Sequence, residues 1–364
     1  MFNRPVFCLR LWVLLLLSSS AVTACGQPSP AVVEPAAAPA NVLTASTRFY
    51  VDPASHATAE AELMERTRQY RPDDLAAMRM LAAQPVAFWV GDWTQDVTAA
   101  VRERIAAARG KTAVLVAYNM VGRDLGLYSA GGAAGAADYE AWIAAFAAGL
   151  GDGPAVVVVE PDALPHLTEM AEDSGALRIK LLKHAVTTLT ARPNTAVYLD
   201  AGNAGWHDAQ TTAGLLERAG VAGADGFALN VSNFYTTDTS VAYGQAVLAA
   251  LGQSGLRSGR NGAGAAMGFV VDTSRNGNGP LAVEDDPDAA AKAAREQWCN
   301  PPGRAVGLTP RAVPGPAGVH AYLWVKCPGE SDGTCRGAPR AGTWWPEYAL
   351  GLVRNATKAP AGDD

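Results

Sequence analysis

The sequence predicts one α/β domain in which parallel strands close into a distorted (β/α) barrel of about seven strands, similar to a TIM barrel. Short apolar, β-rich runs alternate along the chain with segments of helical period. Seven or eight such repeats occur without a dinucleotide-binding fingerprint, which favours a closed barrel over a doubly wound sheet. One run, residues 155–159, contains four consecutive valines, as expected of a strand buried on both faces.

The first 25 residues have the features of an export signal. Arg4 and Arg10 form a basic start, and the apolar residues 11–17 are fewer than the roughly 20 needed to span a bilayer. The small-residue cleavage site ends in Cys25, as in a bacterial lipobox, where the cysteine is acylated and becomes the mature N-terminus. We therefore expect a cell-envelope lipoprotein that touches the membrane only through Cys25. A plain secretory signal, and hence a secreted protein, is the alternative.

Three segments follow the signal. Residues 26–46 are rich in Pro and Ala without a periodic pattern and predict a flexible tether. Residues 47–357 are long enough for one large barrel domain, and residues 358–364 form a C-terminal tail. No second domain or internal repeat is expected, and we expect a monomer.

Composition excludes several classes of function. The chain is 49% hydrophobic and 18% charged with a formal net charge of -6, and no Lys/Arg cluster provides a footprint for nucleic acid. Its five histidines lack the spacings of a zinc site. No glycine-rich phosphate loop follows a predicted strand. We therefore expect no nucleic-acid partner, no metal and no cofactor.

The elements of the barrel are predicted in chain order. Strands are expected at residues 49–51, 86–90, 113–118, 155–159, 196–199, 226–230, 267–271 and 321–325. Helices are expected at residues 59–81, 97–109, 138–150, 175–190, 211–219, 243–251 and 287–297.

Polar side chains follow six consecutive strands. Because the parallel strands of a barrel end on one face, these side chains should converge on one cleft. Each acid taken alone could instead cap the helix that follows it. The groups are Arg123 with Asp124, Glu160 with Asp162, Asp200, Asn230 with Asn233, Asp272, and Lys326 with Glu330 and Asp332.

Tryptophans accompany these acids. Aromatic rings stack on the apolar faces of sugars, whereas carboxylates and amides bind sugar hydroxyl groups. The combination therefore points to carbohydrate as the ligand. Trp93 also follows an early strand, Trp324 is assigned to the core because it lies within a strand, and Trp89, Trp206 and Trp298 are candidate sugar platforms.

Three cysteines remain once Cys8 and Cys25 are assigned to the signal and its cleavage site. An odd number in an exported chain implies one pair and one free thiol. Cys299 and Cys335 both lie in loops rich in Pro and Gly, so we predict a disulfide between them and a free Cys327. A bond between Cys327 and Cys335 is the alternative.

Several spaced segments carry a recognisable pattern. They are residues 49–53, 118–124, 128–132, 160–164, 198–206, 230–233, 298–303 and 324–333, which include the Arg123-Asp124 pair, Glu160-Pro161-Asp162 and Trp298-Cys299. These segments resemble those of glycoside hydrolase family 6, the inverting β-1,4-glucanases. The resemblance spans the whole predicted domain in the right order.

The resemblance implies hydrolysis of internal β-1,4-glucosidic bonds in cellulose or a related β-glucan. It matches Asp162 to the general acid, Asp124 to a neighbouring acid that helps to keep it protonated, and Asp332 to the base, about 6.5–9.5 Å from the acid. It matches Ser129 to a group that holds the attacking water and Tyr118 to a residue that distorts the reactive sugar. Arg123 would keep Asp124 ionised.

The resemblance also implies the groups that bind the glucan. These are Trp89, Arg123, Asp200, Asn203, Trp206, Asn230, Asn233, Trp298, Lys326 and Glu330. The chain departs from the family at Leu125, Asn203 and Cys327, which replace a cysteine, a histidine and a small residue or proline. Short segments at residues 206–230 and 299–326 favour an open cleft and endo action. A cellobiohydrolase of the same family and a surface carbohydrate-binding protein without catalysis are the alternatives.

Overall fold

The computed structural model describes residues 43–126, 128–255, 267–282, 297–313 and 318–356, all within one compact unit, Ala38–Asp364. The predicted signal with Cys25, most of the tether, the C-terminal tail and most of the helix expected at residues 287–297 lie outside the described residues.

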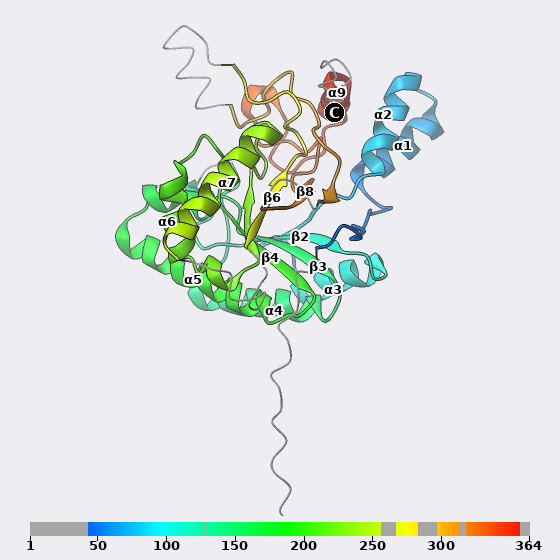
Figure 1. The fold of residues 1–364 in the computed structure, drawn as a ribbon. Helices are drawn as coiled ribbons and strands as arrows, with labels where there is room; N and C mark the ends of the chain where they lie inside the picture. Colours follow the sequence, from blue (N-terminus) through cyan, green and yellow to red (C-terminus); the bar gives the residue numbers. More distant parts are fainter. Residues whose placement is uncertain (1–42, 127, 256–266, 283–296, 314–317, 357–364) are drawn as a thin grey trace, which may run out of the picture. The chain divides into compact units, whose positions relative to one another are not determined.

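An eight-stranded sheet forms the centre of this unit, with the order β1-β2-β3-β4-β5-β6-β8-β7 (Figure 1). Neighbours from β1 to β8 are parallel, and β7 runs antiparallel to β8. The described chain thus confirms the parallel sheet of about seven strands. The strands are β1 (Phe88–Gly91), β2 (Ala113–Tyr118), β3 (Ala155–Val159), β4 (Thr195–Asp200), β5 (Gly226–Leu229), β6 (Gly268–Asp272), β7 (Arg311–Ala312) and β8 (Val319–Leu323).

The sheet curls until its first and last parallel strands meet. Val86, two residues before β1, forms an isolated parallel bridge with Trp324, which follows β8 directly. The N–H of Ala87 donates to the Trp324 carbonyl at 3.0 Å. The result is a distorted barrel in which the carboxyl ends of the parallel strands share one rim.

Strand side chains alternate between two hydrophobic cores. Val156 and Val158 pack inside the curled sheet, whereas Val157 and Val159 pack against the surrounding helices. This two-residue period explains why the strand is apolar throughout, because both of its faces are buried.

Helices of the described chain cover the outer face of the sheet (Figure 1). Side chains of Asp96, Asp208 and Thr236 cap the first turns of α3, α6 and α7. The helices are α3 (Val97–Ala108), α4 (Ala136–Leu150), α5 (Glu172–Thr190), α6 (Ala209–Arg218) and α7 (Thr237–Gln253), with short 3₁₀ turns η1 (Asp124–Gly126), η2 (Pro165–Glu169), η3 (Val221–Gly223) and η4 (Cys335–Gly337).

The N-terminal and C-terminal parts of the domain differ from the prediction. The helix expected at residues 59–81 is two helices, α1 (His56–Thr67) and α2 (Pro72–Ala82), because Arg68 turns left-handed and Pro72 begins the second. The strand expected at residues 49–51 contributes one bridge, from Phe49 to Thr112. Helix α9 (Pro346–Ala356) was not predicted; it packs beside α2 in a third apolar cluster.

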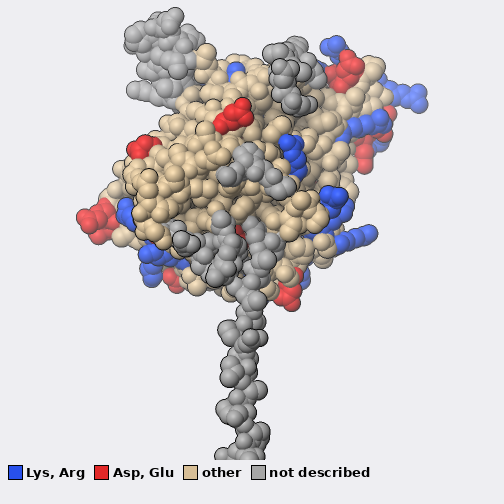
Figure 2. All heavy atoms as spheres, in the orientation of Figure 1, with Lys and Arg blue, Asp and Glu red and all other residues tan. Residues whose placement is uncertain are grey.

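Charged side chains of both signs are interspersed around the margin of the face shown in Figure 2. Within the described residues, no helix is long and apolar enough to cross a membrane.

Candidate active site

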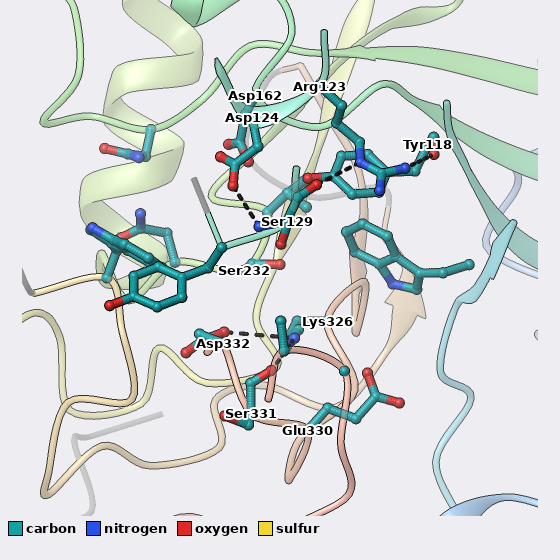
Figure 3. Close-up of a pocket in the computed structure, with 18 of the residues that line it drawn as sticks. Tyr118, Arg123, Asp124, Ser129, Asp162, Ser232, Lys326, Glu330, Ser331 and Asp332 are labelled. Carbon is teal, nitrogen blue, oxygen red and sulfur yellow. Dashed lines mark hydrogen bonds and ion pairs between the residues drawn. The ribbon is translucent and has the colours of Figure 1, made fainter. Parts of the chain in front are cut away.

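A cavity of about 610 Å³ opens where the parallel strands end. Figure 3 shows Asp124 and Asp162 together on one side of it, with Asp332 and Lys326 across from them. Asp200 and Asn230 lie behind the wall and do not line the cavity. The predicted site residues that do line it are Trp89, Tyr118, Arg123, Asp124, Ser129, Asp162, Asn203, Trp206, Asn233, Trp298, Lys326, Glu330 and Asp332.

The turn after β3 places one acid inside the protein and the other at the cavity. Glu160 and Asp162 both adopt positive φ angles, 52° and 67°, so the chain bends sharply as it leaves the strand. The buried Glu160 carboxylate accepts the N–H groups of Asn119 at 3.0 Å and Met120 at 2.9 Å. Burial raises the pKa of Glu160 to about 7. Glu160 therefore ties the end of β2 to β3, while Asp162 reaches the cavity.

The surroundings of Asp162 favour its protonated form. Burial raises its pKa well above the ordinary value, and the nearby carboxylates of Asp200 and Asp124 raise the pKa further. Asp200 lies behind Asp162, and burial raises the pKa of Asp200 to about 7. Asp162 is thus suited to donate a proton near neutral pH.

Asp124 holds the neighbouring loop as well as facing Asp162. Its Oδ2 accepts the N–H of Ser129 at 2.7 Å, which sets Ser129 beside the cavity. Burial raises the pKa of Asp124, although the Ser129 hydrogen bond and the charges of His166 and Arg123 oppose the rise. Two adjacent carboxyl groups with raised pKa values can share one proton across the working pH range.

Arg123 forms its ion pair with Asp92, and its charge also lowers the pKa of Asp124, the direction expected from the resemblance. Its Nη1 lies 3.0 Å from Oδ1 of Asp92, a residue at the end of β1. The N–H groups of Arg123 also donate to backbone carbonyls, among them Tyr118 and Ser129, both at 2.8 Å. Arg123 therefore organises the wall, and its influence on the pKa of Asp124 is the last of several effects.

Asp332 is surrounded by positive charge. Its Oδ2 lies 2.8 Å from Nη1 of the buried Arg275, and its Oδ1 lies 3.6 Å from Nζ of Lys326. Asn300 adds a backbone N–H at 3.0 Å. Burial alone would raise the pKa of Asp332, but the two cations outweigh it and lower the pKa. Asp332 is thus an ionised carboxylate, in contrast to Asp162.

Aromatic side chains line the walls between these acids. The indole N–H of Trp89 donates to the Val325 carbonyl at 2.8 Å, and its ring meets Tyr118 edge to face at 5.1 Å. Trp206 meets His166 edge to face at 4.8 Å. Trp298 packs near Tyr128 with ring centroids 5.7 Å apart. These contacts fix the rings as preformed surfaces along the cavity.

Three buried polar groups behind the wall connect the strand ends. The amide of Asn230 bonds the backbone of Tyr235 through both its oxygen and nitrogen, at 3.1 Å each. Asp272 accepts N–H groups of Ser232 at 2.9 Å and Lys326 at 3.0 Å. Asp200 accepts the N–H of Asp162 at 2.9 Å. All three groups therefore act on the cavity through the backbone that they hold.

The disulfide prediction is confirmed. Cys299 and Cys335 are bonded, with Cα atoms 6.3 Å apart. The bond lies beside Asn300, whose side-chain oxygen accepts the N–H of Asp332 at 2.9 Å, so it supports the loop that carries this acid. Cys327 is free and half-buried, and burial raises its pKa well above the ordinary value.

Sequence reasoning missed several residues of the site. Asp92 and Arg275 matter through partners that are distant in the sequence, so no local pattern reveals them. His166 carries no signal of its own in the sequence, and it reaches the cavity because it lies on η2, the turn that follows Asp162. Trp93 and Tyr128 also line the cavity, at 55% and 50% exposure. No group of three or more His, Cys, Asp or Glu within the described ranges is arranged to hold a metal ion.

Comparisons with known proteins identify the family of this chain. The family described as Glycosyl hydrolases family 6 matches residues 44–356. Endoglucanase A of Cellulomonas fimi is 40% identical over 313 residues, covering 85% of this chain and 61% of that protein. Endoglucanase 1 of Streptomyces halstedii is 39% identical over 338 residues, covering 90% and 95%. This chain therefore spans less than two thirds of the first relative and nearly all of the second.

A solved structure shares the fold. The endoglucanase Cel6 of Mycobacterium tuberculosis, in complex with a methyl-cellobiosyl-4-deoxy-4-thio-β-D-cellobioside, superimposes with a TM-score of 0.75 at 41% identity, covering 87% of this chain and 100% of that one. Exoglucanase A of Cellulomonas fimi is more distant, at 27% identity over 84% of this chain and 47% of that protein. With the family match spanning the whole described domain, this chain is a member of glycosyl hydrolase family 6.

Proposed function

We propose that the protein is an endo-β-1,4-glucanase that hydrolyses internal bonds of cellulose or a related β-glucan with inversion. One observation carries the proposal: two carboxyl groups face one cavity, and their surroundings shift their pKa values in opposite directions. Burial raises the pKa of Asp162, and the charges of Arg275 and Lys326 lower the pKa of Asp332. An inverting glycosidase needs such a pair, one group as proton donor and one as base.

In this mechanism Asp162 protonates the glycosidic oxygen as the bond breaks. Asp332 accepts a proton from the water that attacks the opposite face of the sugar, and Ser129 holds that water. Asp124 shares protons with Asp162 and keeps it ready as an acid. Tyr118, which packs against Trp89 in the wall, crowds the reacting sugar toward a distorted ring.

The glucan lies along the walls of the cavity. Trp89, Trp206 and Trp298 stack on sugar faces, and Asn203, Asn233, Lys326 and Glu330 bind hydroxyl groups. Asp200 and Asn230 support this binding from behind the wall, because their polar atoms hold the backbone there.

The mode of attack is tested with carboxymethyl-cellulose by following viscosity and reducing ends together. An endo-acting enzyme lowers viscosity long before reducing sugar accumulates. Viscosity that falls only in proportion to released sugar would instead identify a cellobiohydrolase, and no released sugar a binding protein. Proton NMR of the first product checks the stereochemistry, since inversion of a β bond gives the α anomer.

We also propose that residues 1–25 direct export, that acylated Cys25 anchors the protein to the envelope through the tether, and that residues 47–357 act as a monomeric catalytic domain. The support is the basic and apolar pattern before Cys25. Metabolic labelling with radioactive palmitate in a bacterial host should mark the native chain, and a Cys25→Ala variant should lose the label. Equal labelling of both would contradict the anchor.

A further inference from the structure

The segment after β2 folds back on itself beside the cavity and carries two of the proposed catalytic groups. The N–H of Arg123 donates to the Gly131 carbonyl at 3.2 Å, which closes an isolated antiparallel bridge. Within this fold, Asp124 accepts the N–H of Ser129. The placement of a hydroxyl group and a carboxyl group relative to Asp162 therefore depends on how this segment is held.

Arg123 is the centre of the segment. Its guanidinium lies 4.5 Å from the ring centroid of Tyr118 and is 6% exposed. It donates to carbonyls on both arms, Tyr118 on the outgoing arm at 2.8 Å and Ser129 on the returning arm at 2.8 Å. Arg123 thus joins the strand end to the part of the segment that carries Ser129.

Asp92 holds Arg123 from the neighbouring strand. Its Oδ1 accepts Nη1 of Arg123 at 3.0 Å, and its Oδ2 accepts the N–H of Gly132 at 3.0 Å. The Asp92 carboxylate therefore holds both Arg123, at the centre of the segment, and Gly132, at the end of the returning arm. Asp92 does not itself line the cavity.

Two glycines, Gly131 and Gly132, allow the backbone to approach Asp92 closely. A Cβ atom on Gly131 would lie 2.5 Å from both Arg123 Nη2 and Asp92 Oδ2, and one on Gly132 would lie 1.9 Å from the Met120 carbonyl oxygen. Both glycines have positive φ, 151° and 95°. At Gly132 the contact is with the backbone, so no side chain fits there, whereas a side chain at Gly131 would have to displace the ends of Arg123 and Asp92. The approach of the returning arm to Asp92 therefore depends on glycine at these positions.

We propose that Asp92 is a positioning residue for hydrolysis: by fixing Arg123 and Gly132 it sets Ser129 and Asp124 against Asp162. The inference rests on the proposed function, because it assumes that those three residues act on the glucan. Since Asp92 lies outside the cavity, removing its carboxylate should slow the reaction more than it weakens substrate binding.

The test measures kcat and KM separately on a soluble cello-oligosaccharide, together with thermal unfolding by circular dichroism. We expect Asp92→Ala to lower kcat at least fivefold and to change KM by a smaller factor. Asp92→Asn keeps an acceptor but loses the charge, so it should lower kcat at least twofold. Glu65→Gln is the matched control. It breaks an exposed ion pair in which Glu65 Oε1 lies 2.6 Å from Arg79 Nη2, and it should leave kcat and KM unchanged.

The positioning role would be overturned if kcat of Asp92→Ala fell less than fivefold. It would also be overturned if KM rose by a factor equal to or greater than the factor by which kcat fell. If Asp92→Ala does not fold, Asp92→Asn decides by its own threshold. Asp162→Asn is assayed in parallel. Hydrolysis that is retained in Asp162→Asn refutes the proposed function. Loss of hydrolysis in Asp162→Asn, together with an unchanged kcat in Asp92→Ala, refutes only the positioning role of Asp92. A double variant with Arg123→Lys should lose less kcat than the product of the two single losses, because both changes break the shared contact between Arg123 and Asp92.

Discussion

The backbone N–H of Asp162 donates a hydrogen bond of 2.9 Å to Oδ2 of Asp200. The same oxygen accepts the N–H of Gly202 at 3.2 Å, so the acid that faces the cavity is held from behind by a second carboxyl group at the end of β4. This contact joins position and protonation, because Asp200 fixes the backbone of Asp162 while its charge raises the pKa of that residue.

Replacing Asp162 should remove hydrolysis without removing binding. A positioned general acid contributes about 10²–10⁴-fold to the rate, so Asp162→Ala should lower kcat on carboxymethyl-cellulose by a factor in that range. Titration calorimetry with a cello-oligosaccharide should show affinity close to that of the native protein, since the aromatic walls are untouched. Substantial remaining activity would refute the assignment of Asp162 as the acid.

Replacing Asp200 should move the alkaline side of the pH profile. Asp162 must be protonated, so kcat falls as pH rises through its pKa, and the charge of Asp200 raises that pKa. Asp200→Asn keeps an oxygen for the Asp162 N–H but removes the charge, so the alkaline limb of kcat should shift to lower pH. Asp208→Asn, at the exposed start of α6, should leave the limb in place. A shift to higher pH would contradict this coupling.

Replacing Arg275 should move the acidic side of the profile in the opposite sense. Asp332 must be ionised, so activity falls as pH drops through its pKa, which the charge of Arg275 lowers against the effect of burial. Arg275→Met should therefore shift the acidic limb to higher pH and reduce stability, because a buried carboxylate loses its partner. Arg79→Met is the control, because it breaks an exposed ion pair between Arg79 on α2 and Glu65 on α1. An unmoved acidic limb would exclude Asp332 as the base.

Removing the disulfide should affect stability and activity together. The bond joins cysteines 36 residues apart, for which the chain-entropy relation gives a stabilisation of about 4 kcal/mol. The Cys299→Ser/Cys335→Ser variant should lose about that much of its free energy of unfolding and so unfold at a lower denaturant concentration. Its kcat should fall because Asn300 no longer holds Asp332 firmly. Cys327→Ala should leave the response to a reducing agent unchanged. Native stability that is insensitive to reduction would contradict the prediction.

Local signals were sufficient for the parallel strands. Residues 113–118 and 155–159 are apolar on both faces because helices cover one side and the barrel interior the other, and this pattern is visible in the sequence. The break between α1 and α2 was missed although Pro72, which disfavours a helical residue before it, marks the start of the second helix. Residues 49–51 have strand composition, but the described chain gives Phe49 a single bridging partner.

The site could be predicted as a set of carboxylates but not as a set of charges. Strand ends identified Asp124, Asp162 and Asp332 because parallel strands finish at one rim. The pKa of Asp332 depends on Arg275, which lies 57 residues away in the chain. The segment that carries Asp124 contacts Asp92, which lies 31 residues from Arg123. Pairings at such separations leave no local pattern, so the ion pair between Arg123 and Asp92 could not be predicted.

The barrel closes at a seam, where the residues before β1 meet those after β8 through the bridge between Val86 and Trp324. Between β2 and β3 the register holds five residue pairs, whereas across the seam the described residues provide one bridge, the hydrogen bond from Ala87 to Trp324 and that from the Trp89 indole to Val325. Trp89 and Lys326 lie on opposite sides of this seam, and both line the cavity. Because fewer backbone hydrogen bonds cross this seam than join β2 to β3, amide hydrogens at residues 86 and 87 should exchange sooner than those of β3. We expect the width of the cavity to vary most at this seam, between Trp89 and Lys326.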